Sequence, residues 1–162
     1  MDFGVGPLSA ARLRREESFL LDLGELVLTG QTDLVAEGEG RRVLIDWKSD
    51  RVEGEALKER ASHYELQMQL YALALAESGQ KADEAFLVFL RSQEKHRIDI
   101  SDAALETARM AALDIARDAR AIGGDVARVD LSLDSLSSPR NPPCKFCAWR
   151  EGPCTPGYRD SD

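Results

Sequence analysis

The sequence predicts a mixed α/β fold, in which one β-sheet is flanked by helices. Three observations indicate this class: a hairpin-like pair of strands around a polar glycine-containing loop, a long helical period after it, and then a short apolar run. A strand that follows a helix in this way can pair in parallel with the strand before the helix. We therefore expect a three-stranded meander, a crossover helix and a further buried strand.

Composition indicates a single globular domain. The chain has 162 residues, of which 43% are hydrophobic and 31% charged. Its formal net charge of −8 argues against a surface that binds polyanions in general, although a bound metal or a local basic cluster can still recruit nucleic acid. No apolar run approaches the roughly 18 residues that span a membrane, and no signal-peptide pattern is present. We expect a cytoplasmic protein that does not bind membranes.

The first half of the chain predicts an antiparallel meander. The first sixteen residues have some helical character without a cap, and we interpret them as the remnant of an upstream element. The predicted strands span residues 17–23, 26–36 and 42–48, with a tight turn at Gly24-Glu25 and a polar loop at 37–41. Both faces of the second and third strands carry apolar residues, so we expect both faces to be covered.

The second half predicts two helices around a buried strand. Apolar and aromatic residues recur at three- and four-residue steps over residues 55–78: Leu57, Ala61, Tyr64, Met68, Tyr71 and Leu75. Strands are expected at 84–91 and 96–100, and a helix from the N-cap Ser101 to about Ile122. We interpret 1–162 as one domain, with a core at 15–122 and a loop and cysteine-rich tail at 132–162.

Two acids occupy mirror positions in the predicted hairpin. If the turn centres between residues 39 and 40, Asp33 lies opposite Asp46, and Gln31 lies opposite Lys48. Opposed residues share a face, with Cβ atoms roughly 4.5–5.5 Å apart. The strand period of two places Lys48 on the same face as Asp46. Two adjacent carboxylates repel, so such a pair indicates a divalent cation or a retained proton.

This group of residues suits phosphodiester hydrolysis. Asp33 and Asp46 would hold Mg²⁺ or Mn²⁺, with the carbonyl of Trp47 as a further ligand, and the ion would lower the pKa of a bound water. Lys48 would orient the water or stabilise developing charge. The alternative is a surface hairpin with an Asp–Lys pair.

One face of the long helix carries polar residues. Tyr64, Gln67 and Tyr71 share this face. Gln67 needs a hydrogen-bond partner if it faces the sheet, so we expect it at the site. For the two tyrosines, packing in the core is favoured over contact with substrate.

These motifs together resemble the PD-(D/E)XK nucleases of the RecB type. The resemblance rests on G-x-x-D-L at 30–34, I-D-W-K-S at 45–49, Y-x-x-Q-x-x-x-Y at 64–71 and the R-E-E-S-F strand opening at 15–19. It implies a restriction-endonuclease-like fold, in which Asp33 and Asp46 bind the metal and Lys48 is the catalytic lysine. Gln67 and Tyr71 would form the motif that follows the lysine, and Tyr64 is a candidate for substrate contact.

The resemblance also implies an activity and partners. Such domains lie at the C-termini of RecB, AddA and AddB helicase–nuclease subunits, and they also occur in CRISPR-associated iron–sulfur exonucleases. We therefore expect a Mg²⁺-dependent deoxyribonuclease that acts in double-strand-break repair beside a helicase domain or subunit of an AddAB- or RecBCD-like enzyme, with exonuclease favoured over endonuclease action. The alternative is a degenerate nuclease fold that only binds DNA or docks another subunit.

One part of the family pattern is not found in this sequence. The family fold begins with a helix that carries a His or Glu metal ligand, and neither His63 nor His96 lies ahead of the first strand. We expect the chain to be the C-terminal part of a longer protein. Glu17 is the nearest acid that could take the place of that ligand.

Three cysteines close the chain. Cys144, Cys147 and Cys154 have a spacing found in zinc and iron–sulfur sites. Unligated thiols and a zinc-ribbon interaction module are the alternatives. The resemblance implies a [4Fe–4S] cluster that is completed by a fourth cysteine outside this chain.

Overall fold

Five strands form one mixed sheet in the order β1-β2-β3-β4-β5. The computed structural model describes the backbone of residues 2–123 and the side chains of residues 2–120. The elements are β1 (Arg12–Asp22), β2 (Val27–Gly38), β3 (Arg41–Lys48), α1 (Glu55–Glu77), β4 (Glu84–Phe89), β5 (Glu94–Ile98) and α2 (Asp102–Gly123). Residues up to Ala116 form one compact unit, and a second unit begins at Arg117. All that follows concerns the first unit.

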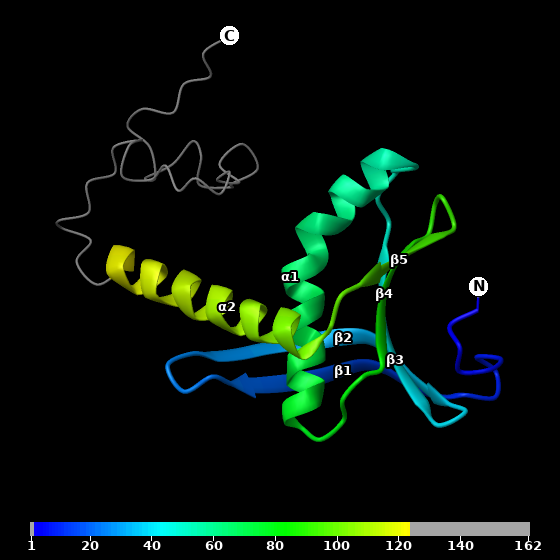
Figure 1. Cartoon of the computed structure of the whole chain (residues 1–162), viewed down its shortest axis with the longest axis horizontal. Helices are drawn as coiled ribbons and strands as arrows, with labels where there is room; N and C mark the ends of the chain where they lie inside the picture. The colour runs from blue at the N-terminus through cyan, green and yellow to red at the C-terminus, as the bar shows by residue number, and fades with distance from the viewer. Residues whose placement is uncertain (1, 124–162) are drawn as a thin grey trace, which may run out of the picture. The chain divides into compact units, whose positions relative to one another are not determined.

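The sheet has the topology that the sequence predicts. Strands β1, β2 and β3 form an antiparallel meander, β3 and β4 are parallel, and β5 is antiparallel to β4. Helix α1 makes the crossover between β3 and β4 and packs against the sheet (Figure 1). The predicted α/β class and the α+β arrangement of a restriction-endonuclease-like sheet are confirmed. Neither described helix is both long and apolar enough to cross a membrane.

The β2–β3 turn has the predicted centre. Gly38 pairs with Arg41, which leaves Glu39 and Gly40 as a two-residue loop. Both loop residues have positive φ, 52° and 73°, as a type I′ hairpin turn requires. This turn sets the register of every later pair in the hairpin.

Both faces of the central strands are buried, as predicted. On one face, Val35 and Leu44 pack with the buried stripe of α1, which includes Leu57, Ala61, Met68 and Leu75. On the other face, a second apolar cluster is built on the sheet residues Leu34, Ala36, Val43, Ile45, Phe86 and Val88. The two clusters are separated by the sheet, as expected for strands whose apolar residues alternate between both faces.

The second face is covered by the N-terminal segment, which corrects the interpretation of the first sixteen residues. No helix precedes β1 in the described range; β1 already begins at Arg12. Phe3 and Val5 are buried in the second cluster, and the ring of Phe3 meets that of Phe86 edge to face at 5.7 Å. Local propensity lost to tertiary contacts, because these residues bury apolar area only against the sheet. The packed unit thus includes residues ahead of position 15.

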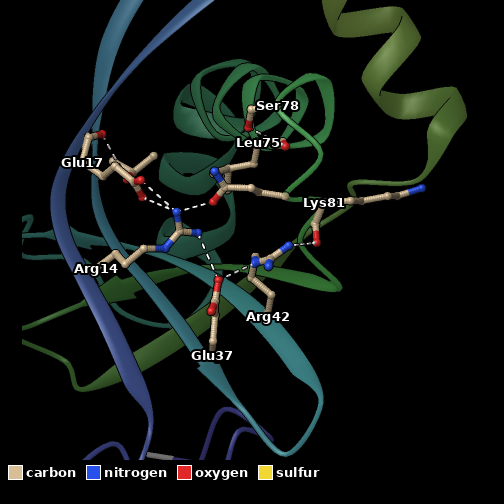
Figure 2. A network of polar contacts seen from close by, with 9 residues as sticks. Arg14, Glu17, Glu37, Arg42, Leu75, Ser78 and Lys81 are labelled. Carbon is tan, nitrogen blue, oxygen red and sulfur yellow. Dashed lines mark hydrogen bonds and ion pairs between the residues drawn. The ribbon is translucent and has the colours of Figure 1, made fainter.

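A polar network ties three strands to the end of α1. Arg14 of β1 contacts Glu17, Glu37 and Gln80, and Glu37 also accepts a hydrogen bond from Arg42 Nε at 2.8 Å (Figure 2). The hydrogen bond from Arg42, helped by the charges of Arg42 and Arg14, lowers the pKa of Glu37 below its ordinary value of 4.5. The network holds the edge of the meander to the turn that leads into β4.

Strand β1 changes its alternation within this network. Glu16 has a left-handed φ of 51°, a conformation that is strained for a non-glycine residue. It allows Arg14 and Glu17 to contact each other, at 2.8 Å, although an unbroken strand would point them to opposite faces. The pairs on either side of Glu16 join Arg15 to Leu34 and Glu17 to Thr32, so the irregularity falls opposite Asp33.

Candidate active site

The candidate site lies where β2 and β3 part. Their pairing ends at Leu34 and Ile45; beyond this point β2 pairs only with β1, and β3 only with β4. Continuing the register by one residue places Asp33 opposite Asp46, as predicted. The further prediction that Gln31 lies opposite Lys48 is wrong, because β2 has left β3 by then. Gln31 pairs with Ser18 of β1 instead.

Asp33 replaces the missing rung of the hairpin. Its Oδ2 atom accepts a hydrogen bond from the backbone N–H of Trp47 at 2.8 Å. A backbone donor that β2 would otherwise satisfy is thus paired with a carboxylate. The bond fixes one oxygen of Asp33 against β3 and leaves the other carboxylate oxygen for a different partner.

Asp46 is one of two buried polar side chains in the described part of the chain, with a residue exposure of 3%. Its Oδ2 atom lies 2.7 Å from Lys48 Nζ, but the contact lacks hydrogen-bond geometry, and no other group donates to this oxygen among the described residues. Burial raises the pKa of Asp46 above its ordinary value, and the charge of Asp33 adds to this, while Lys48 acts in the opposite direction. The site therefore holds more negative charge than its own lysine compensates.

Lys48 is held on three sides. Besides the ion pair with Asp46, its Nζ atom donates to Gln67 Oε1 at 3.2 Å and lies 3.9 Å from the ring centroid of Tyr64. Its side chain is only 13% exposed. Ion pair, hydrogen bond and cation–π contact together restrict an otherwise flexible side chain to one position beside Asp46.

Gln67 and Tyr71 extend this arrangement along α1. Gln67 Nε2 donates to the hydroxyl of Tyr71 at 2.7 Å, and the Tyr71 ring packs edge to face on Phe19 of β1 at 5.2 Å. Both tyrosines of the helix are partly buried against the core, as predicted. The predicted face of α1 thus brings Gln67 to Lys48, and Tyr71 fixes the orientation of the Gln67 amide.

Asp50 and Arg60 are two residues of the site that the sequence did not reveal. Arg60 Nε donates to Asp50 Oδ1 at 2.7 Å, and the hydroxyl of Tyr64 donates to Asp50 Oδ2 at 3.0 Å. Burial alone would raise the pKa of Asp50, but the hydrogen bonds from Arg60 and Tyr64 hold it below its ordinary value. The available signals were the strand period from Lys48 to Asp50 and the helical period from Arg60 to Tyr64.

The donor set at this point fits a hard divalent cation. Asp33 and Asp46 supply carboxylates, and the backbone supplies a third oxygen. The carbonyl of Lys48 accepts from Leu90 of β4 at 2.9 Å, so the preceding carbonyl, that of Trp47, points the other way, towards β2. Mg²⁺ binds to one or two carboxylates and retains several waters, so three protein oxygens suffice.

Glu17 does not complete a larger ligand set. It contacts Arg14 instead, and no group of three or more His, Cys, Asp or Glu side chains that could hold a metal ion occurs among the described residues. The suggestion that Glu17 supplies a ligand is therefore not supported. The predicted cluster ligands Cys144, Cys147 and Cys154 lie outside the described residues.

The comparisons with known proteins agree with the motifs. The family described as the PD-(D/E)XK nuclease superfamily matches residues 3–152. The A-type subunit of an ATP-dependent helicase/nuclease from Carboxydothermus hydrogenoformans is 37% identical over 75 residues, which cover 46% of this chain and 6% of that protein. The protein of the same name from Listeria monocytogenes serotype 4a is 30% identical over 127 residues, covering 63% of this chain and 10% of its own length.

A likeness to one solved structure is weaker. The crystal structure of SSO0001 has a TM-score of 0.43 and 16% identity, and the match covers 64% of this chain and 50% of that one. The chain spans a tenth or less of the length of the curated relatives named above.

Proposed function

Because the chain belongs to the PD-(D/E)XK nuclease superfamily, we propose that it is a divalent-metal-dependent deoxyribonuclease. The observation that carries the proposal is the meeting of Asp33, Asp46 and Lys48 where β2 and β3 part. A buried acid with an unpaired oxygen, a second acid and a restrained lysine form a site for a metal and a phosphate. The reaction is hydrolysis of a DNA phosphodiester bond, with exonuclease action as the preferred mode.

Asp33, Asp46 and the carbonyl of Trp47 would hold Mg²⁺ or Mn²⁺. The bound ion would neutralise a non-bridging phosphate oxygen and lower the pKa of a coordinated water. The N–H of Trp47 keeps Asp33 oriented, and burial keeps Asp46 in place. These residues therefore set the position at which the phosphate binds.

Lys48 would act on the reacting groups directly. Its ammonium group is next to Asp46 and partly shielded from solvent, so its positive charge is only weakly screened. It can orient the attacking water or stabilise the charge that develops on the phosphate oxygens. Gln67 and Tyr64 hold the ammonium group in position and thereby avoid a reorganisation during the reaction.

The relatives suggest the wider setting. They are named as subunits of an ATP-dependent helicase/nuclease, and this chain matches a small part of each. We propose that the chain works with a helicase domain or subunit of the AddAB or RecBCD kind, in the repair of DNA double-strand breaks. The helicase would unwind the duplex and supply the strand that is cut.

The test compares the full chain with Asp46→Asn and Lys48→Ala on end-labelled single-stranded and duplex DNA, with Mg²⁺, Mn²⁺ or EDTA. Removing one group that stabilises transition-state charge should lower the cleavage rate by about 100-fold or more. Lys58→Ala is the matched control, since Lys58 is an exposed lysine of α1 that contacts only Glu55. Cleavage that is equal in Asp46→Asn and in the parent chain would contradict the proposal.

The alternative of a non-catalytic DNA-binding or docking module has one observation in its favour. No group of three potential ligand side chains occurs in the described part of the chain. Calorimetric titration with Mn²⁺ separates the two functions. A catalytic site should bind the ion in the parent chain and lose it in Asp46→Asn, whereas a scaffold should show no difference between them.

A further inference from the structure

The indole of Trp47 lies on the sheet face opposite to Lys48. Strand alternation sends Asp46 and Lys48 to the face of α1 and Trp47 to the other face. Its neighbours on that face, Leu34 and Ile45, are buried, but Trp47 keeps an exposure of 36%. A large aromatic side chain that is exposed beside a candidate active site needs an explanation other than packing.

Trp47 forms a wall of an open pocket. The N-terminal segment that covers this face contributes Leu8 and Ser9, and the sheet contributes Leu13, Leu34, Arg15 and Asp33. The pocket volume is about 320 Å³, at the small end of the range for ligand sites. Its lining is largely apolar, because three leucines and the indole outweigh one serine and two charged groups. Such a lining suits a flat ring with a charged substituent.

The two charged residues of the pocket have different situations. Asp33 belongs to the candidate metal site as well, and its bond to the Trp47 N–H links the pocket to that site. Arg15 is exposed and makes no ion pair or hydrogen bond within the described part of the chain. An arginine without an internal acid is free to contact a phosphate, for which its planar guanidinium is well suited.

We propose that this pocket binds one unpaired nucleobase of the DNA strand whose phosphate lies at Asp33, Asp46 and Lys48. Trp47 stacks on the base, the leucines surround its edge, and Arg15 contacts the phosphate of the same nucleotide. The inference rests on the proposed nuclease function and adds a preference for single strands or frayed ends. A base in a duplex is already stacked on its neighbours and has no free face for Trp47.

Tryptophan fluorescence tests the proposal directly. The chain has two tryptophans, so Trp149→Phe leaves Trp47 as the sole indole. This variant of the full chain is titrated in EDTA with an oligothymidylate and with a duplex of equal length. We expect saturable quenching by the single strand and little by the duplex. Equal quenching by both would overturn the strand preference, and no quenching by either would overturn the pocket assignment.

Substitutions then measure the contribution of each group. Trp47→Ala should weaken single-strand binding roughly 5- to 100-fold, the range expected for one stacked base, and Trp47→Phe should lose less. Arg15→Ala should weaken binding and reduce its salt dependence by about one phosphate contact. Leu20→Ala is the matched control, because Leu20 is 66% exposed on β1 and does not line the pocket. Trp47→Phe also guards against misfolding, since it keeps an aromatic ring on the sheet.

The outcomes distinguish this inference from the nuclease proposal. If Asp46→Asn abolishes cleavage while Trp47→Ala binds the single strand as tightly as the parent, the nuclease function stands and the pocket assignment fails. If the single strand quenches Trp47 but no metal supports cleavage, the pocket stands and the nuclease proposal fails. A blue-shifted Trp47 emission that no DNA alters would mean that protein covers the indole, which also overturns the assignment.

Discussion

Lys48 Nζ lies 3.9 Å from the centre of the Tyr64 ring, while the Tyr64 hydroxyl donates to Asp50 at 3.0 Å. The ring thus contacts a residue of the proposed catalytic group with its face, and its hydroxyl is held by a second set of charges. Arg60 completes that set by donating to both Asp50 and Tyr64. Asp50 follows Lys48 by two residues, so strand and helix are tied together beside the lysine.

Replacing Tyr64 should separate the effect of its ring from that of its hydroxyl. Tyr64→Leu removes the ring and should lower kcat of DNA cleavage about 3- to 30-fold, which corresponds to a cation–π contact of roughly 0.5–2 kcal/mol. Tyr64→Phe keeps the ring and should retain most of kcat. Rates are measured at saturating DNA, so that KM is obtained separately. A Tyr64→Leu chain with the parent kcat would show that the ring does not position Lys48.

Gln67 should affect activity much more than its neighbour on the same helix. Gln67→Leu removes the acceptor for Lys48 and leaves the Tyr71 hydroxyl without its donor. A hydrogen bond to a charged group contributes about 1.5–3 kcal/mol, so we expect kcat to fall about 10- to 100-fold. Gln69→Leu is the control, because Gln69 contacts Glu65 and the carbonyl of Asp99 instead. Equal losses in both variants would indicate a general effect on α1.

Glu37 should make stability depend on pH in acid. Its pKa is lowered in the folded chain, so it stabilises the fold above its ordinary pKa of 4.5, and this contribution is lost as pH falls through the folded-state pKa. Glu37→Gln should lower the free energy of unfolding by about 1 kcal/mol at pH 7. The difference between parent and variant should shrink below about pH 4.5 in urea titrations.

The control for this titration is Glu39→Gln. Glu39 is exposed in the adjacent turn, and its substitution should leave the unfolding midpoint nearly unchanged at all pH values. A parent–variant difference for Glu37 that stays constant from pH 7 to pH 3 would contradict the assignment of the network. It would mean that the neutral glutamine loses packing rather than charge.

Gly38 should tolerate no side chain. A Cβ atom at this position would lie 2.2 Å from the carbonyl oxygen of Val5, in the segment that covers the second core cluster. Gly38→Ala should therefore displace that segment and destabilise the chain by about 1–3 kcal/mol. Because Leu8 belongs to the same segment, the Trp47 pocket should also open and the Trp47 emission should shift to the red. Gly40→Asn is the control, since its φ of 73° suits Asn and no atom lies within 4 Å.

Much of the fold could be predicted because it follows from local rules. Positive φ at two neighbouring turn residues requires a hairpin, and the hairpin sets the register that opposes Asp33 and Asp46. The buried stripe of α1 follows from a 3.6-residue period, which also brings Gln67 to the site. The N-terminal segment could not be predicted in this way, because its apolar residues have no period and only the sheet determines their place.

The parting of β2 and β3 and the irregularity at Glu16 were not predictable from alternation. Both depend on how the whole sheet twists, since β2 must follow β1 while β3 follows β4. The same limit applies to Asp50 and Arg60. Their pairing requires that the loop after β3 and the first turns of α1 approach each other, and no sequence period specifies that approach.

The sequence by itself determined the order of the elements, the hairpin register and the identity of the two acids, the lysine and the glutamine. These follow from spacing along one strand pair or one helix, where neighbours in space are neighbours in the pattern. Only the tertiary structure decided that Trp47 is exposed, that Arg15 is free and that Tyr64 lies over Lys48. Each of these depends on contacts between distant segments, whose packing free energies no local spacing encodes.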